Sequence, residues 1–181
     1  MTAEVPVQRE TTRLFLALWP SPRLRAALLE HQRTWRWPSR AAVVRPDKLH
    51  LTLHFIGNVP RDRLALLSKG LELPFAPFTL DFDQPELWRS GLAVLQPDSP
   101  PQGLQQLHDA LGQALRQLEL PAETRKFRPH ITLARHAGGA VPPADKPVLH
   151  WRVQDYALVE SMTEPAGQYR LLQRYAWQQT A

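Results

Sequence analysis

The fold follows from the four residues HLTL at positions 50–53, because the second half of the chain carries the matching HITL at positions 130–133. Side chains alternate along a strand, so His and Thr two positions apart share one face, about 7 Å from each other, and the aliphatic residues point to the opposite face. Each strand therefore presents one imidazole and one hydroxyl away from the core. If the two strands pack side by side, two imidazoles and two hydroxyls meet in one cleft.

The same order of elements precedes each motif. In the first half a strand at 13–18 leads to a helix capped by Ser21 and ended by Pro38, and then to a strand at 49–56 closed by Gly57. In the second half a strand at 91–95 leads to a helix opened by Ser99, which carries leucines at positions 104, 107, 111, 115 and 118, and then to a strand at 127–134. This order predicts an α+β fold of two similar strand-helix-strand lobes, a bilobal arrangement whose antiparallel sheets face a central cleft.

Shorter elements complete the two lobes. Leucines spaced through residues 60–71 predict a short helix, and residues 78–82 a short strand. The tail predicts a hairpin of strands at 156–160 and 169–177, with a turn around residues 165–167 that contains Pro and Gly.

Length and composition indicate one domain. The chain has 181 residues, of which 43% are hydrophobic and 22% charged, as is typical of a single globular core. We expect a flexible N-terminus at residues 1–12 and one domain at residues 13–181. No apolar run approaches the roughly 20 residues of a membrane span, and the N-terminus lacks a secretory pattern, so we expect a cytoplasmic protein. The absence of cysteine excludes disulfides, thiolate zinc sites and a cysteine nucleophile.

Arginine dominates the positive charge. The net charge is +5, and 18 of the 22 basic residues are arginine. Guanidinium groups match phosphate oxygens two at a time, so this excess is a weak indication of a phosphate-bearing partner.

The paired motifs suit acid and base catalysis. Imidazole titrates near pH 6.5, so one histidine can take a proton from water while the other gives a proton to a leaving oxygen. Threonine hydroxyls can hold phosphate oxygens in line. No third metal ligand lies in register in both motifs, so we expect no metal. A single His-x-Thr is usually an ordinary polar pair, but its repetition at equivalent positions favours a functional site built from His50, Thr52, His130 and Thr132.

Alternation makes three further predictions. His54 shares a face with His50 and is expected at the cleft rim or on the surface, because Ala134 takes the matching place in the second motif. Arg13 and Phe15 share one face of the first strand, where Phe15 could stack on a base and Arg13 reach a phosphate. The alternative is that both faces of this strand are simply covered.

Four stretches carry a resemblance to a known family. They are RLFLAL at 13–18, KLHLTLHFIG at 48–57, FRPHITLAR at 127–135, and LVES at 158–161 with the following Gly167 and Tyr169. Together with the paired motifs they resemble the 2H phosphoesterase superfamily, most closely its RNA 2′,3′-cyclic phosphodiesterase branch, also called 2′-5′ RNA ligase-like. The resemblance extends over almost the whole chain from residue 13.

The resemblance implies hydrolysis of RNA 2′,3′-cyclic phosphate ends to 2′-phosphomonoesters, without metal or other cofactor, and reversible 2′-5′ joining of ends. It implies that His50 protonates the leaving 3′ oxygen and His130 activates water, although a symmetric site also admits the reverse. Thr52, Thr132 and Arg135 would bind the phosphate. Alternation directs Arg135 toward the core, so this role requires the strand to end or bulge near residue 134.

The partner implied by the family is RNA with cyclic phosphate ends, including ends derived from tRNA. We expect the protein to be a monomer and not to associate with a membrane. Two alternatives remain open. One is a related enzyme acting on small cyclic nucleotides, and the other is a non-catalytic module that binds RNA ends.

Overall fold

The computed structural model describes residues 10–163 and 167–178. Most of the predicted N-terminal segment and residues 165–166 of the predicted turn lie outside the described residues. The first strand begins at Thr11, so two residues assigned to a flexible terminus belong to the sheet instead. Thr12 is buried there and donates a hydrogen bond to the carboxylate of Glu160, which is why the strand extends this far.

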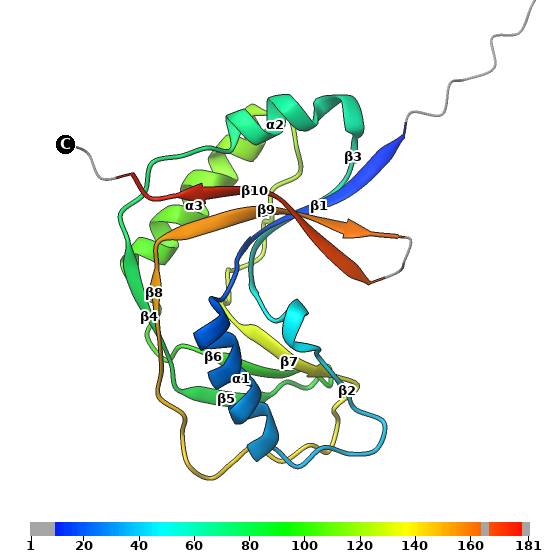
Figure 1. Cartoon of the computed structure of the whole chain (residues 1–181), viewed down its shortest axis with the longest axis vertical. Coiled ribbons are helices and arrows are strands. Elements are labelled where there is room, and N and C mark those ends of the chain that lie inside the picture. The colour runs from blue at the N-terminus through cyan, green and yellow to red at the C-terminus, as the bar shows by residue number, and fades with distance from the viewer. Residues whose placement is uncertain (1–9, 164–166, 179–181) are drawn as a thin grey trace, which may run out of the picture.

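Within the described residues, the structure combines ten strands and three α-helices in a mixed α/β fold (Figure 1). The strands are β1 (Thr11–Leu18), β2 (Ala42–Val43), β3 (Leu51–Pro60), β4 (Phe78–Phe82), β5 (Gln84–Leu87), β6 (Ala93–Gln96), β7 (Ile131–Arg135), β8 (Leu149–Val153), β9 (Asp155–Met162) and β10 (Gln168–Ala176). The helices are α1 (Pro22–Thr34), α2 (Leu64–Gly70) and α3 (Gln102–Gln117), with short 3-10 turns at Pro46–Lys48 and Arg61–Arg63.

An eight-stranded sheet runs through the molecule in the order β10-β9-β1-β3-β7-β6-β5, with β2 paired to β7. All its pairings are antiparallel, as predicted for both halves. A second sheet contains β4 and β8. The predicted arrangement of two separate sheets needs correction, because a single residue pair, Leu51 with Ile131, joins the two halves.

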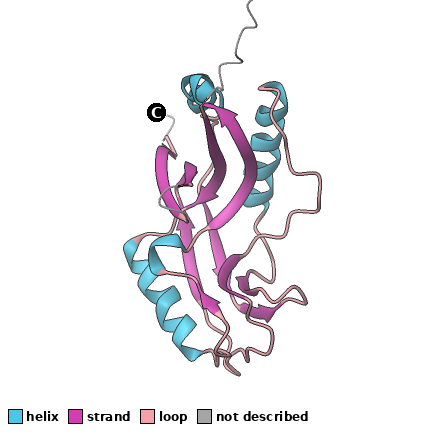
Figure 2. Ribbon diagram, turned by 90° about the vertical axis from the view of Figure 1, so that its right-hand side faces the viewer, coloured by secondary structure: helices cyan, strands magenta, loops and turns pink. Residues whose placement is uncertain are grey.

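The two long helices are exchanged between the halves. The side-chain amide of Gln32 in α1 donates to the Leu133 carbonyl of β7, at 2.9 Å, so α1 packs on the half built from the second repeat. The backbone carbonyl of His108 in α3 lies 2.8 Å from a ring nitrogen of His54 in β3, so α3 packs on the half built from the first repeat. Figure 2 shows α1 low on one side of the molecule and α3 high on the other. The prediction that each lobe contains its own helix is therefore wrong.

Several element boundaries differ from the predictions for identifiable reasons. Helix α1 keeps its predicted cap, since the Ser21 hydroxyl accepts from the Leu24 N–H at 3.3 Å, but it ends at Thr34, before Pro38. Helix α3 starts after Pro101 without a side-chain cap, so Ser99 does not open it. Strand β3 continues through Gly57, whose φ of 88° accommodates a bulge, and pairs with β1 as far as Pro60.

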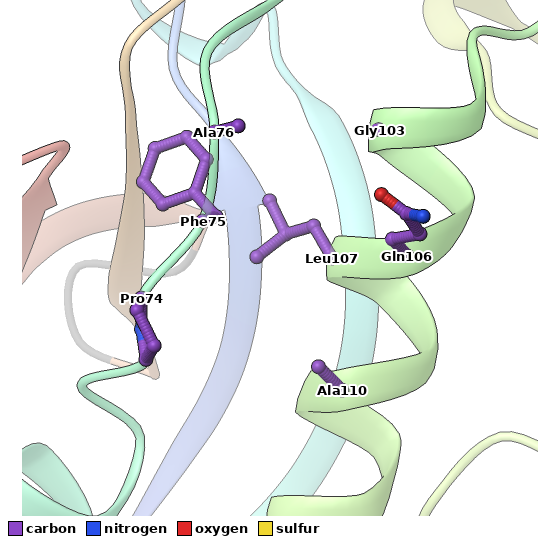
Figure 3. Close-up of a pocket in the computed structure, with 7 residues that line it drawn as sticks. All are labelled: Pro74, Phe75, Ala76, Gly103, Gln106, Leu107 and Ala110. Carbon is purple, nitrogen blue, oxygen red and sulfur yellow. The ribbon is translucent and has the colours of Figure 1, made fainter.

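Two apolar clusters cover the two faces of β1. Leu14, Leu16 and Leu18 belong to the main core, which also contains the leucines of α3. The next residues in alternation, Phe15, Ala17 and Trp19, form a smaller cluster with Ala157 and Val159. Figure 3 shows a cavity of about 200 Å³ between the segment that carries Phe75 and helix α3, whose Leu107 side chain extends toward that segment.

No helix in the described part of the chain is long and apolar enough to span a membrane.

Candidate active site

The two motifs meet where the halves of the sheet join. His50 directly precedes β3 and His130 directly precedes β7, and the next residues, Leu51 and Ile131, pair with each other in antiparallel orientation. In an antiparallel pair the following residue of one strand lies opposite the preceding residue of the other. Thr52 therefore lies opposite His130, and Thr132 lies opposite His50. The predicted convergence of the two motifs is confirmed.

The two faces of the motifs separate as alternation predicts. The aliphatic positions are at most 3% exposed and belong to the main core; they are Leu51, Leu53, Ile131 and Leu133. The polar positions remain partly accessible; they are His50, Thr52, His130 and Thr132. Four polar side chains thus lie on the side of the sheet that faces away from the core.

Both motif histidines are held in the same way. Nδ1 of His50 lies 2.6 Å from the Lys48 carbonyl, and Nδ1 of His130 lies 2.7 Å from the Arg128 carbonyl. Because a carbonyl only accepts, each Nδ1 carries a hydrogen and donates it. This tautomer leaves both Nε2 atoms able to accept, and the Thr52 hydroxyl lies 3.1 Å from Nε2 of His50.

An aromatic box surrounds His50. The Trp19 ring stacks on the imidazole with centroids 5.3 Å apart and planes 7° apart, Tyr169 meets it edge-on at 5.4 Å, and Phe15 lies at 5.1 Å. Burial among these rings, together with the nearby charges of Arg135 and His130, lowers the pKa of His50 to about 4, although the hydrogen bond to the Lys48 carbonyl acts in the opposite direction.

The position of Phe15 corrects the prediction that it stacks on a base. Its side chain is only 4% exposed and packs against His50, Phe55 and Tyr169. A ring covered in this way has no free face for a nucleobase, so its contribution is to hold the His50 imidazole in place.

His130 has a different neighbourhood. Trp88, in the turn after β5, lies 4.6 Å from the imidazole, and the Arg128 guanidinium sits 4.2 Å over the Trp88 ring. Burial lowers the pKa of His130, and the charges of Arg128 and Arg135 act in the same direction. Both imidazoles are therefore predominantly neutral at pH 7.

Matching bulges change the face of the residues that follow each motif. Leu16 and Ala17 of β1 pair with His54 and Thr52, so Leu53 is an extra residue in β3. In the same way, Ala93 and Val94 of β6 pair with Ala134 and Thr132, so Leu133 is an extra residue in β7.

The predicted role of Arg135 required strand β7 to end or bulge near residue 134, and the bulge at Leu133 meets this requirement. Ala134 is buried, Arg135 is exposed, and the charge of Arg135 acts on both motif histidines. The guanidinium therefore lies near enough to both imidazoles for its charge to lower their pKa values.

The bulge in β3 overturns the prediction for His54. This side chain turns into the core, where it is 1% exposed and stacks on His108 at 4.1 Å. Phe55 takes its place on the accessible side, 60% exposed and 6.4 Å from Phe15. Phe55 follows its bulge as Arg135 follows the other, and comparing the two motifs position by position would have identified it.

Arg13 is exposed, as its alternation predicts, but lies far from the motif residues. Ala17 of the same strand pairs with Thr52, and Arg13 is four residues earlier, about 13 Å along the strand. The structure therefore does not bring Arg13 to the two imidazoles.

The assembled groups suit a phosphate-sized anion. Two imidazoles, two hydroxyls and one guanidinium converge, and among the described residues no three His, Asp or Glu side chains gather as metal ligands. Hydroxyl and guanidinium groups donate to phosphate oxygens, and neutral imidazoles exchange protons near pH 7.

Comparison with known proteins agrees with this geometry. A family model described as the 2′-5′ RNA ligase superfamily matches residues 20–161. The protein is 34% identical over 179 residues to the RNA 2′,3′-cyclic phosphodiesterase of Escherichia coli (strain K12), an alignment that covers 92% of this chain and 97% of that one. It is 32% identical to the RNA 2′,3′-cyclic phosphodiesterase of Thermus thermophilus, with 91% and 89% covered.

Solved structures show the same fold. The crystal structure of E. coli LigT complexed with 3′-AMP has a TM-score of 0.82 at 30% identity and covers 94% of this chain and 100% of that chain. A crystal structure of TT0787 from Thermus thermophilus has a TM-score of 0.72 at 29% identity, with 91% and 97% covered.

Proposed function

The chain belongs to the 2′-5′ RNA ligase superfamily, and from this membership we propose that it hydrolyses the 2′,3′-cyclic phosphate ends of RNA to 2′-phosphomonoesters. The observation that carries the proposal is the antiparallel meeting of the two motifs at Leu51 and Ile131. This pairing brings the imidazole and hydroxyl of one motif beside those of the other, and the Arg135 charge acts on both imidazoles.

The two histidines would act from opposite sides of the phosphorus. His130 would take a proton from water as its oxygen forms a bond to phosphorus, and His50 would give a proton to the 3′ oxygen as its bond to phosphorus breaks. Because each Nδ1 donates to a backbone carbonyl, each Nε2 is the atom left for proton transfer. His130 would accept the proton from water at Nε2, and His50 would first take up a proton at Nε2 when the anion binds and then give it to the 3′ oxygen. With a 5′ hydroxyl in place of water as the nucleophile, the same pair would open the cyclic phosphate and join two ends through a 2′-5′ bond, and the reverse of that step would cleave the bond and re-form the cyclic phosphate.

The remaining polar groups would hold the non-bridging oxygens. Thr52 and Thr132 would each donate a hydroxyl hydrogen bond, and Arg135 would neutralise charge that develops during attack. The Thr52 hydroxyl is engaged with His50, so substrate binding would exchange that hydrogen bond for one to the phosphate. Every group in this scheme comes from one chain, as a monomeric enzyme requires.

The direct test is turnover of an oligonucleotide with a 2′,3′-cyclic phosphate end in the presence of EDTA. We expect a 2′-phosphomonoester product and a bell-shaped pH dependence of kcat/KM. Binding without turnover would favour a non-catalytic module. Equal kcat/KM for a cyclic mononucleotide and the oligonucleotide would favour an enzyme of small cyclic nucleotides.

Anion binding is expected to take up a proton. A bound anion offsets the desolvation that lowers the pKa of His50, so this pKa is higher in the complex than in the free protein. Affinity for sulfate, whose charge is constant over this range, should therefore rise as the pH falls from 7 toward 5, by at most about tenfold per unit for each linked proton. Calorimetric titration at several pH values measures the effect.

The matched control is His50→Gln, which keeps a hydrogen-bonding side chain of similar size but cannot titrate. Its sulfate affinity should depend less on pH than that of the wild type. A pH-independent affinity in the wild-type protein would contradict proton uptake at this site.

Phe55 is expected to stack on the base of the terminal nucleotide. Its ring is exposed beside the box around His50, and base-aromatic stacking contributes about 1–3 kcal/mol. Phe55→Ala should therefore raise KM for a cyclic nucleotide by about fivefold to a hundredfold, with a smaller change in kcat. Leu66→Ala removes a similarly exposed apolar side chain from α2 and should leave KM unchanged. An unaltered KM in Phe55→Ala would exclude this role.

A further inference from the structure

A second cavity, of about 450 Å³, lies next to the active site. It opens between the start of α1 and the corner where β8 passes into β9. Trp19 belongs to both sites, because its ring stacks on His50 and its side chain also lines this cavity. A group bound here would lie beside Trp19, the residue whose ring stacks on the His50 imidazole.

The cavity carries an excess of positive charge. Its lining includes three arginines, Arg25, Arg152 and Arg174, and one acidic residue, Asp155. Within the described part of the chain only Arg174 of these three forms an ion pair, with Asp155 at 2.9 Å. Two guanidinium groups therefore remain for a ligand. The Arg25 guanidinium also donates to the Pro20 carbonyl at 3.4 Å, and its buried Nε has no hydrogen-bond partner among the described residues.

The start of α1 adds to this positive potential. Ser21 and Pro22 line the cavity, and they stand at the N-terminal end of a thirteen-residue helix. The first turn contains no acidic side chain to offset the partial positive charge of the helix end. Arginine side chains and a helix N-terminus together favour a phosphate group over an apolar ligand.

We propose that this cavity binds the internucleotide phosphate nearest the cyclic end of an RNA substrate. The inference rests on the proposed function, which places the cyclic phosphate beside His50. The next phosphate along the chain must then lie close to that imidazole, and the arginine-lined cavity behind Trp19 is adjacent to it. The backbone of the RNA would pass the edge of the Trp19 ring, and the site would distinguish RNA from a mononucleotide.

The test compares two substrates that differ by one nucleoside and the internucleotide phosphate that joins it. A dinucleotide with a 2′,3′-cyclic phosphate end carries one internucleotide phosphate, and a cyclic mononucleotide carries none. In the double variant Arg25→Ala/Arg152→Ala, the ratio of kcat/KM for the dinucleotide to that for the mononucleotide should fall about tenfold. The slope of log kcat/KM for the dinucleotide against log salt concentration should also become shallower by about one. Arg152→Gln alone should give a smaller change in the same direction and guards against a folding defect at the start of α1.

Two controls make the result specific. Arg33→Ala removes an exposed arginine from the other end of α1 and should leave the ratio unchanged. A methylphosphonate linkage, which lacks the phosphate charge, should lower the ratio in the wild type but cause no further loss in the double variant.

The outcomes separate this inference from the proposed function. If the wild type cleaves neither substrate, the proposed function is wrong and this inference falls with it. If it cleaves both and the double variant keeps the wild-type ratio, only this inference is overturned. Weaker binding of inorganic pyrophosphate by the double variant, with an unchanged ratio, would assign the cavity to a small anion and overturn the RNA assignment.

Discussion

Replacing His130 by alanine is expected to lower kcat for a cyclic-phosphate oligonucleotide roughly 100- to 10,000-fold, and His50→Gln should have an effect of the same order. Each substitution removes one of the two groups that would transfer a proton at the phosphorus. The hydrogen bonds from Nδ1 to the carbonyls of Lys48 and Arg128 show that each ring is oriented by its own backbone, so one variant should not disorder the other imidazole. Single-turnover kinetics in EDTA measures the loss directly.

The double variant gives the sharper result. If both histidines act in one step, His50→Gln/His130→Ala should be little slower than the slower single variant, because groups that act as a unit give strongly non-additive losses. Far-UV circular dichroism and thermal unfolding should resemble those of the wild type. Wild-type turnover in either single variant would defeat the proposed roles.

The double variant Arg61→Ala/Arg170→Ala is expected to lower the free energy of unfolding by about 3–5 kcal/mol at pH 7. Glu160 is 3% exposed and accepts hydrogen bonds from Arg61 and Arg170, each at 2.9 Å, and from Thr12. Removal of both guanidinium groups would leave a buried carboxylate with one hydroxyl partner. Urea unfolding at pH 7 measures the loss.

The pH dependence of this effect follows from Glu160. Burial alone raises the pKa of this carboxyl, but the hydrogen bonds from Thr12 and Arg170 outweigh it, and the net pKa is lowered. The wild-type network therefore stabilises the fold fully above the unfolded pKa and loses this contribution as the pH falls through the folded pKa. In the double variant burial dominates, so protonation relieves the buried charge. The difference in stability between wild type and variant should narrow between pH 7 and pH 4.

An exposed ion pair provides the control for the network. Arg33 and Glu30 are both 70% exposed, and Arg33→Ala should change the free energy of unfolding by less than about 1 kcal/mol. A loss of that small size in Arg61→Ala/Arg170→Ala would show that Glu160 is solvated or neutral and would contradict the expected effect.

The polar positions of the site could be predicted because the signal is local and occurs twice. His50 and Thr52 share a face for the same geometric reason as His130 and Thr132, and this period of two requires no knowledge of the rest of the chain. The buried state of Leu51 and Ile131 followed from the same pattern. Two copies at equivalent places also predicted that the motifs would meet.

The prediction failed where a strand departs from regular alternation. His54 was expected at the rim and is buried, while Phe55 was not singled out and is exposed. The bulge at Leu53 depends on how β3 pairs with β1, and that pairing involves residues far away in the sequence. Phe15 was misread for a related reason, since its cover comes from Tyr169 near the other end of the chain.

By itself, therefore, the sequence determined which polar residues of the two motifs share a face and which side of each strand they begin on. Only the tertiary structure decided that α1 and α3 exchange halves, that the charge of Arg135 acts on both motif histidines, and that Trp19 both stacks on His50 and lines a second cavity. The physical reason is that alternation is a property of the local backbone. Bulges, helix docking and ring packing instead minimise the exposed apolar surface of segments that meet only when the chain folds.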